Sequence, residues 1–376
     1  AEEKLVSCLV SIKEFKMNRK YLFPFLLLLQ FIFIKILSFF PEFVEEYYSN
    51  GLYVFISKIS RILLGWIPFS FGDVIYLILI LFLLFKLYKN RKSVFSWKSW
   101  KLEWKSNFLG ILKVVSIFYF FFNILWGLNY HRIPLYEKMN LDKEYTAEEL
   151  IVFTKKMIVK VNEIHSQIEQ NASSKIVNPY DIETIYGKTQ KGYDQLGNKY
   201  ASFTYKNPSI KKSLVSLPLT YMGFGGYLNP FTNEAQVNYK IPKYNFPTTV
   251  CHEMAHQIGY ASESEANFVG YLASINNDDI YFQYSGYAYA LKYCLENIER
   301  FEEGKSKELF PLIHPGVLKN YQESKDFWET HQTPIDTFFH YFYDNFLKAN
   351  QQKDGMEGYS KFVGLMMGYY KHTIKL

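Results

Sequence analysis

The sequence has very few cysteines and no marked excess of one charge, and both shortages limit what the protein can be. Its three cysteines, Cys8, Cys251 and Cys294, do not make a disulfide framework, and an odd number leaves at least one thiol free. The net charge is only +6, from 42 basic and 36 acidic residues. The excess comes from one local segment, so no nucleic-acid partner is predicted.

Long apolar runs are present, and they crowd into the first third of the chain. The 376 residues suffice for two domains, or for a membrane region and one domain. The sequence predicts three transmembrane helices at about residues 21–40, 72–88 and 108–128, because each run can cross a bilayer. Basic residues precede the first run and no small-residue cleavage site follows it, so it is interpreted as a signal anchor. Residues 1–16, which precede Met17, are interpreted as an upstream extension.

The charges between these runs predict an orientation. The segment between the second and third runs contains one acidic residue, Glu103, and seven basic ones: Lys86, Lys89, Arg91, Lys92, Lys98, Lys101 and Lys105. The positive-inside rule places this segment in the cytoplasm. Residues 1–20 are then a cytoplasmic N-terminus, 21–128 a membrane region and 129–376 an extracytoplasmic domain. Residues 51–70 are predicted to form an amphipathic or re-entrant element on the outer face, ended by Pro68.

The chemistry is concentrated in the motif His252-Glu253-Met254-Ala255-His256, which has the pattern HExxH. Positions i and i+4 share one face of a helix, so His252 and His256 can direct two imidazoles at one ion. Glu253 lies beside them, where a carboxylate can take a proton from a water on the metal. The alternative is a buried helix with two satisfied histidines. Cys251 is expected to pack behind the site, since adjacent helix positions point about 100° apart.

A third ligand is expected just after the motif. Gly259 is placed to end the helix in a left-handed conformation, and a second helix is predicted from Glu263. A zinc site with two histidines needs another protein ligand and an open position. Glu263 is the favoured candidate and Glu265 the second. Asn267 falls one turn after Glu263 and is expected to hydrogen-bond a ligand from outside the coordination sphere. The glutamate that does not bind is expected to be either an ordinary solvated carboxylate or a further hydrogen-bonding partner just outside the coordination sphere.

These residues resemble two related groups of proteins. The pattern Glu263-x-x-Ala266-Asn267 is similar to the E-x-x-A-[DN] helix of gluzincin metallopeptidases, although the seven-residue step from His256 to Glu263 is shorter than in most of them. The segments PFSFGD (68–73), WGLNYHR (126–132), NPFTNEAQVN (229–238) and HEMAHQIGYASESEANF (252–268) together resemble the DUF3810 family of bacterial membrane proteins, which is grouped with zincin-like peptidases. The resemblance implies a bacterial inner-membrane location, a periplasmic domain and one Zn²⁺ per chain. It implies no substrate.

The expected fold is mainly α with a small β-sheet: three N-terminal transmembrane helices followed by a zincin-like α+β metallopeptidase domain. A capping box at Thr146 and Glu149 predicts a helix to about Glu169, with His165 on its surface, and another helix is predicted at 181–200. Strands are predicted at 213–217 and 234–238. Three further helices are expected at about 281–303, 321–350 and 356–371. Residues 234–238, or the backbone of 225–227, are candidates to pair with an extended peptide substrate, unless this hairpin is purely structural.

The predicted function is hydrolysis of peptide bonds by a membrane-anchored zinc metallopeptidase. His252, His256 and Glu263 would hold the zinc, and Glu253 would act as general base. The partners are then the lipid bilayer and a peptide or protein substrate; the oligomeric state is not predicted. Residues proposed to stabilise the oxyanion are His314, His331, His340, Tyr359 and His372.

Three other functions were considered. Cleavage within the bilayer is disfavoured, because the residues around His252 are too polar for a membrane span. A non-catalytic metal-binding scaffold or sensor of the envelope needs ligands but no base, so Glu253 argues against it. A zinc amidase acting on a non-protein substrate, such as peptidoglycan stem peptides, stays open, since it would use the same residues.

Overall fold

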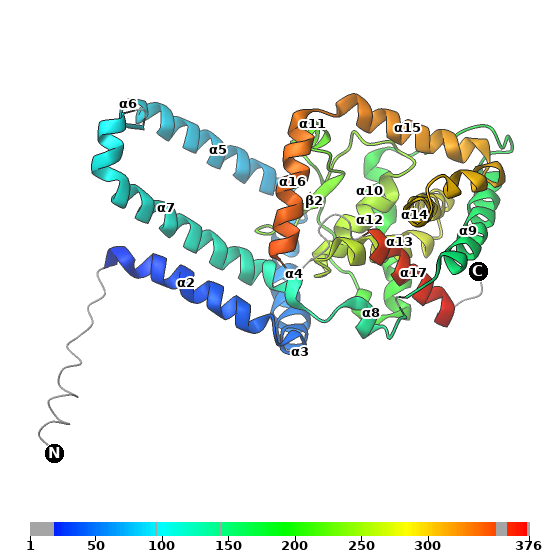
Figure 1. Ribbon diagram of the computed structural model, residues 1–376, viewed down its shortest axis with the longest axis horizontal. Helices are drawn as coiled ribbons and strands as arrows, with labels where there is room; N and C mark the ends of the chain where they lie inside the picture. Colours follow the sequence, from blue (N-terminus) through cyan, green and yellow to red (C-terminus); the bar gives the residue numbers. More distant parts are fainter. Residues whose placement is uncertain (1–18, 95, 143, 351–358, 374–376) are drawn as a thin grey trace, which may run out of the picture.

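The computed structural model describes the chain except for residues 1–18, 95, 143, 351–358 and 374–376 (Figure 1). Three long helices extend from one side of a larger helical domain, which holds a small sheet near its centre. The prediction of a mainly α chain with a small sheet and three apolar N-terminal helices is therefore confirmed. Cys8 and most of the predicted cytoplasmic N-terminus lie outside the described residues.

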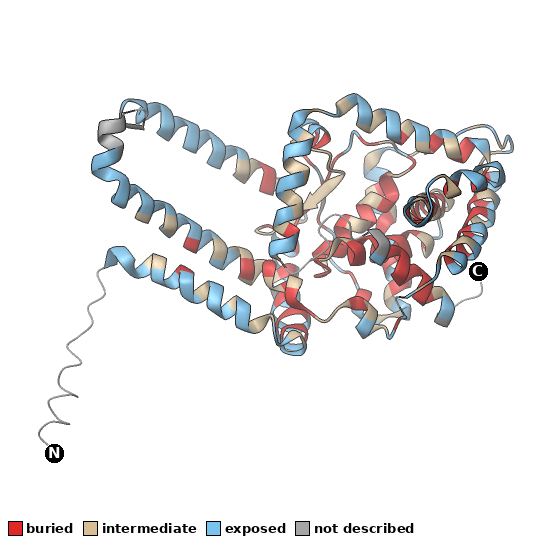
Figure 2. Cartoon of the chain, viewed as in Figure 1, coloured by how far each residue is buried: buried red, intermediate tan, exposed pale blue. Residues whose placement is uncertain are grey.

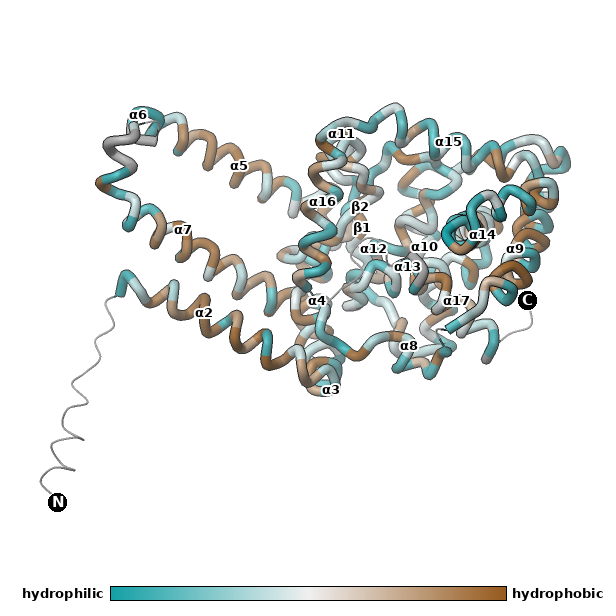
Figure 3. The backbone as a smooth tube through the Cα atoms, in the orientation of Figure 1, coloured by the Kyte–Doolittle hydropathy of each residue, from teal (hydrophilic) through white to brown (hydrophobic). Residues whose placement is uncertain are grey.

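The three long helices are α2 (Arg19–Leu37), α5 (Phe71–Lys89) and α7 (Trp97–Leu125). Each contains a segment long and apolar enough to cross a membrane, in α7 from Lys101 to Leu125. Their residues are both largely hydrophobic and largely exposed, as the colouring of the backbone by burial and by hydropathy shows (Figures 2 and 3). Such exposure would be unfavourable in water and is expected in lipid. The short helix α6 (Arg91–Val94) joins α5 to α7 at the end away from the helical domain (Figure 1), so the basic segment and the domain lie at opposite ends of these helices.

The segment between α2 and α5 packs against the domain. It comprises α3 (Pro41–Phe43), the π-helix η1 (Val44–Leu52) and α4 (Tyr53–Leu64). Helix α4 is amphipathic, as predicted for residues 51–70, but its polar face is the buried one: Tyr53, Ser57 and Arg61 point into the protein. The opposite face is apolar and exposed, with Phe55 63% and Leu63 61% accessible. After α7, the 3-10 turn η2 (Gly127–His131) and α8 (Leu135–Lys138) lead into the domain.

The domain is built from helices around α12 (Phe246–Gln257) and α13 (Glu263–Ile275), which are almost wholly buried. Around them lie α9 (Ala147–Ile168), α10 (Ile182–Lys199), α14 (Ile280–Phe301) and α17 (Tyr359–Thr373), with short 3-10 segments η3 (Ala201–Phe203) and η4 (Lys305–Leu312). The predicted capping box is present, with the Thr146 hydroxyl accepting from Glu149 N–H at 3.2 Å. Helices α12 and α13 approach so closely that a Cβ on Gly270 would lie 2.8 Å from His252 N.

The sheet has three short strands in the order β1 (Ile210–Lys212), β3 (Ala235–Val237) and β2 (Gly226–Leu228). Strand β3 pairs in parallel with β1 and antiparallel with β2, in the registers Ile210–Ala235 and Leu228–Ala235. The predicted substrate strand at 234–238 is therefore central, with both of its edges already paired, so that prediction is wrong for β3. Strand β2 lies at an edge, and the alternative at 225–227 stays a prediction.

Three other predictions are wrong. The strand at 213–217 is instead a turn and helix α11 (Ser216–Tyr221), because the Asp73 carboxylate accepts from Leu214 N–H at 2.8 Å and ends the ladder. The single helix at 321–350 is two, α15 (Pro315–His331) and α16 (Pro334–Ala349), because Thr333 caps a new helix with Pro334 in its first turn. His165 is fully buried, not on the surface, and its Nε2 bonds Ser174 O at 2.9 Å.

Candidate metal centre

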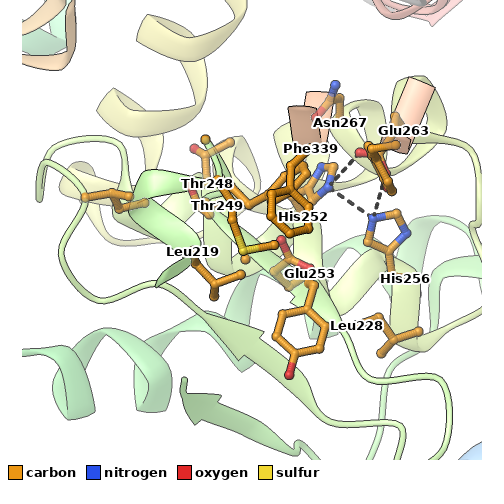
Figure 4. Close-up of a pocket in the computed structure, with 18 of the residues that line it drawn as sticks. Leu219, Leu228, Thr248, Thr249, His252, Glu253, His256, Glu263, Asn267 and Phe339 are labelled. Carbon is orange, nitrogen blue, oxygen red and sulfur yellow. Dashed lines mark hydrogen bonds and ion pairs between the residues drawn. The ribbon is translucent and has the colours of Figure 1, made fainter. Parts of the chain in front are cut away.

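The two histidines of the HExxH motif lie on one face of α12. Pro247 occupies the first turn, where its missing N–H costs nothing, and the helix continues regularly to Gln257. His252 and His256 are one turn apart, and their Nε2 atoms approach to 3.1 Å (Figure 4). Cys251, on another face, is fully buried and outside the cluster, as expected, and burial raises the pKa of its thiol to about 12.

The turn after α12 brings a carboxylate back to this pair. Gly259 has φ +91°, a conformation that side chains disfavour, and its N–H donates to His256 O at 3.0 Å. This left-handed residue reverses the chain within a few positions, so α13 begins at Glu263 beside the histidines. Seven residues are therefore enough to place a third ligand.

The three side chains have the spacing of a zinc site. Glu263 Oε2 lies 3.3 Å from His252 Nε2, and Glu263 Oε1 lies 3.7 Å from His256 Nε2 (Figure 4). Ligand atoms about 2.0–2.1 Å from a tetrahedral zinc would be roughly 3.3–3.4 Å apart. His252, His256 and Glu263 each offer one ligand atom, and these three atoms all lie within 4.8 Å of one another. Among the described residues, they form the group of His, Cys, Asp or Glu side chains that could share one metal ion. The two nitrogens and one carboxylate match zinc chemistry, so the residues fit the ion.

Neighbouring groups fix the orientation of two of these side chains. His256 Nδ1 lies 2.7 Å from Tyr260 O, and a carbonyl can only accept, so the proton is on Nδ1 and the Nε2 lone pair faces the cluster. The Tyr343 hydroxyl, from α16, donates to Glu263 Oε1 at 2.5 Å. Sequence reasoning missed Tyr343, because 80 residues separate it from Glu263 and no local pattern links them.

The electrostatics of the cluster favour a cation. Burial raises the pKa of Glu263, but its hydrogen bond to His252 and its electrostatic interactions with the two imidazoles outweigh burial and lower the pKa to about 2. Burial lowers the pKa of His256 to about 4, so this imidazole is neutral. For His252, burial acts to lower the pKa, but the hydrogen bond to Glu263 and the charge of that carboxylate outweigh burial. The pKa of His252 is therefore raised above its ordinary value. An ionised carboxylate between two imidazoles thus attracts positive charge.

Glu253 lies alongside the cluster and against the sheet. Only 3% of Glu253 is exposed, and its Oε2 finds no hydrogen-bond partner among the described residues. Burial, reinforced by the charge of Glu263 and opposed by His252, raises the pKa of Glu253 to about 8. Gly226 of β2 lies directly against this carboxyl group, since a Cβ there would be 2.6 Å from Glu253 Oε1. Sequence reasoning did not single out Gly226 for this contact.

The two other predicted residues of α13 differ in their relation to the three ligand atoms. Glu265, the second candidate ligand, instead accepts from Leu135 N–H at 2.6 Å, so the structure favours Glu263. Asn267 lines the same cavity as His252, and its Oδ1 accepts from the Tyr289 hydroxyl at 2.7 Å. Asn267 also hydrogen-bonds His252, which helps to raise the pKa of that imidazole. That His252 binds a metal stays a prediction.

The candidates for oxyanion stabilisation are not gathered at the cluster. His314 contacts His165, and His331 Nδ1 donates to Phe327 O at 2.7 Å, so both are engaged elsewhere. His340 stacks on Phe224, whose ring lines the cavity, and is the nearest of the three described candidates to it. The side chains of Tyr359 and His372 lie outside the described residues. Tyr343, which was not considered, lines the cavity directly.

The cluster lies in a cavity of about 630 Å³. Its polar end holds His252, Glu253, His256, Glu263 and Asn267. The other walls are mostly apolar and come from α7, α11, the loop before β2, and α16: Phe122, Trp126, Leu219, Met222, Phe224, Phe339, Phe342 and Phe346. A cavity of this size, largely apolar with convergent polar groups, is typical of a ligand or substrate site.

The fold and site together define a class: a largely helical protein with three candidate membrane helices and a domain that gathers two histidines and a glutamate in a cavity. Within that class, the chain belongs to the DUF3810 family, whose model, described as "Protein of unknown function (DUF3810)", matches residues 48–367. The predicted family is thereby confirmed. No curated protein and no solved structure matches the chain.

Proposed function

We propose that this protein is a membrane-anchored, zinc-dependent metallopeptidase. The observation that carries the proposal is the spacing of His252 Nε2, His256 Nε2 and the Glu263 carboxylate, with Glu253 buried beside them. A group that only bound a metal would need the three ligands but no fourth, unpartnered carboxyl group in the same cavity. The combination of ligands and base is what hydrolysis requires.

Each residue has a distinct role in this proposal. His252, His256 and Glu263 would hold one zinc ion, which when bound supplies a Lewis acid for the scissile carbonyl and for an attacking water. Glu253 takes a proton from the water and delivers it to the leaving amine. Burial raises the pKa of Glu253 above its ordinary value, which favours the protonated carboxyl group that must return a proton to the amine. Tyr343 and Tyr260 position Glu263 and His256.

The membrane part of the proposal is a specific orientation. The basic segment around α6 and the helical domain lie at opposite ends of the three apolar helices (Figure 1). With the basic end in the cytoplasm, the catalytic domain faces the periplasm of a bacterial inner membrane. Single cysteines placed near Lys92 or near Glu308 test this orientation, with a membrane-impermeant, cysteine-reactive label added to intact cells. The cysteine near Glu308 should be labelled and the one near Lys92 should not. Labelling near Lys92 alone would overturn the orientation.

The first experiment measures the zinc content of the full-length protein in detergent. The expected result is one zinc per chain, lost in His252→Ala and in Glu263→Gln. The matched control is Glu265→Gln, which changes a neighbouring carboxylate that lies away from the histidines and should retain the metal. Loss of zinc from Glu265→Gln but not from Glu263→Gln would contradict the assignment of the ligands.

The second experiment tests hydrolysis. A zinc-loaded protein should cleave members of a randomised peptide library, with products identified by mass spectrometry. Glu253→Gln should keep its zinc and lose cleavage by about 10²–10⁴-fold, the usual contribution of a general base. Zinc binding without cleavage would indicate a binding protein, and cleavage only of non-protein amides would indicate an amidase.

A further inference from the structure

The cavity that contains the histidines extends into the region of the membrane helices. Tyr76 of α5 and Phe122 of α7 both line it, together with His252 and Glu263. Tyr76 is five residues inside α5 and Phe122 three residues before the end of α7. At 1.5 Å per residue, these positions are about 5–8 Å along each helix from its domain end. The cavity therefore begins at the depth of the adjacent lipid leaflet.

Helix α16 stands at this boundary. It runs across the ends of α5 and α7 (Figure 1), so in a membrane it would lie along the surface. One side of α16 faces the cavity, with Phe339, Tyr343 and Phe346 in its wall. The other side is also aromatic and is exposed, with Phe338 61% and Tyr341 72% accessible. Aromatic side chains at this level are typical of a helix in the membrane interface.

The chemistry of the walls indicates what can occupy the cavity. Between Tyr76 at the membrane end and Glu263 at the other, the lining of α7, α11 and α16 consists largely of hydrocarbon and aromatic surface. A hydrophilic peptide entering there would lose water without gaining hydrogen bonds, whereas an apolar segment gains about 25 cal/mol for each Å² buried. Polar groups able to bind a peptide backbone are concentrated near Glu253 and β2.

From this continuity, we infer that the substrate is a membrane-borne polypeptide. Its apolar segment enters from the leaflet next to the domain, between α16 and the ends of α5 and α7, and its first residues outside the lipid reach the His252–His256–Glu263 cluster. Phe342 lines the cavity and is also 59% exposed, which places it at the entrance. The inference rests on the proposed peptidase function and adds the class of substrate and its route.

The test compares two peptide libraries with full-length protein in phospholipid vesicles. Both carry the same short randomised sequence. In one library it is joined to a Leu/Ala segment of about 20 residues, enough to span the bilayer. In the other it is joined to a hydrophilic segment of equal length. We expect cleavage of the membrane-borne library to be at least about tenfold faster, equivalent to about 1.4 kcal/mol.

Two substitutions on α16 provide a matched pair. Phe342→Ser and Phe338→Ser each remove one exposed phenylalanine from the same helix, but of the two only Phe342 is found in the described cavity wall. Phe342→Ser should reduce the advantage of the membrane-borne library about tenfold, and Phe338→Ser should leave it unchanged. Equal effects of the two substitutions would overturn the proposed entrance.

A binding measurement separates this inference from the proposed function. Full-length Glu253→Gln is irradiated with the membrane-borne peptide carrying a photoreactive leucine analogue, and the crosslinked residues are mapped. Crosslinks to α16 and the domain end of α7 without cleavage by the wild type would overturn the peptidase proposal but support the route. Equal cleavage of both libraries, with crosslinks confined to α2, would overturn the route and leave the peptidase standing. Absence of both crosslinks and cleavage would overturn both.

Discussion

Replacing Gly226 with alanine tests how the sheet holds the proposed general base. A methyl group at Gly226 would lie 2.6 Å from Glu253 Oε1 and 2.7 Å from Gln236 O, the carbonyl of the paired strand. Both distances are well inside van der Waals contact. The Gln236 carbonyl is fixed by its strand, so the Glu253 side chain must move, or β2 must separate from β3. Either movement changes the packing of β2 against Glu253, while the proposed ligands His252, His256 and Glu263 keep their positions on α12 and α13.

The expected magnitudes follow from these contacts. Overpacking of this kind costs about 1–3 kcal/mol of folding free energy, and loss of a positioned general base costs about 10²–10⁴-fold in rate. The zinc content of Gly226→Ala should stay at the wild-type level. Zinc analysis, thermal unfolding in detergent and cleavage of the peptide library measure the three quantities on one preparation.

The neighbouring residue offers a control for this prediction. A Cβ on Gly225 would meet only Thr249 Cγ2, at 3.3 Å, so Gly225→Ala should be mild. In a Glu253→Ala background, Gly226→Ala should destabilise the protein less than it does alone, because one of its two close contacts has gone. If Gly226→Ala hydrolyses peptides as fast as Gly225→Ala, position 226 does not control the placement of Glu253. Additive effects on stability in the double variant would likewise show that the two positions do not interact.

Three further predictions concern the supports of the site. Tyr343→Phe removes the hydroxyl that donates to Glu263 and should weaken zinc binding about 10–100-fold, measured by competition with a chelating dye; unchanged affinity would contradict this role. Arg132→Met leaves Glu45 buried without its bidentate partner and should cost about 3–5 kcal/mol in thermal unfolding, partly recovered by adding Glu45→Gln. Although burial raises the pKa of Glu45, the hydrogen bonds and charges of Arg132 and Lys138 lower it to about 2, from an ordinary 4.5. The ionised Glu45 therefore contributes on the order of 3 kcal/mol to the free energy of unfolding; this contribution is present above pH 4.5 and is lost as the pH falls toward 2. Glu45→Gln should therefore make stability depend less on acid pH than in the wild type. The same pH dependence of unfolding in both proteins would exclude Glu45 as the cause.

The parts of the site that the sequence predicted are those set by local geometry. His252 and His256 share a face because a helix repeats every 3.6 residues, whatever surrounds it. The position of Glu263 depends on the turn between α12 and α13. Gly259, in its left-handed conformation, makes this turn short enough to bring Glu263 beside the histidines. The three apolar helices were likewise predictable, since each is recognised by its own length and composition.

The parts that the sequence could not give depend on pairings between distant segments. A short polar run such as 234–238 predicts a strand, but only the pairing of β3 with both β1 and β2 shows that it is central. His165 lies in a largely polar stretch between Glu163 and Glu169, yet it is buried against His314, which follows 149 residues later. Tyr343 had no motif of its own because its partner is on another helix.

The candidate membrane helices and the His252–His256–Glu263 cluster are connected through the segments that support them. The carbonyl of Gln257, at the end of α12, accepts from Arg61 at 2.8 Å and from Tyr53 at 3.1 Å, both on α4. The Glu234 carboxylate, next to the central strand, accepts from Gly72 N–H at 2.6 Å and so caps the start of α5. The helix that carries the histidines and the sheet beside it are thus each fixed to an element at the membrane. In the proposed topology the cluster would stay at one height above the lipid, which is unnecessary for cleaving freely diffusing peptides and useful for cutting a chain that emerges from the membrane.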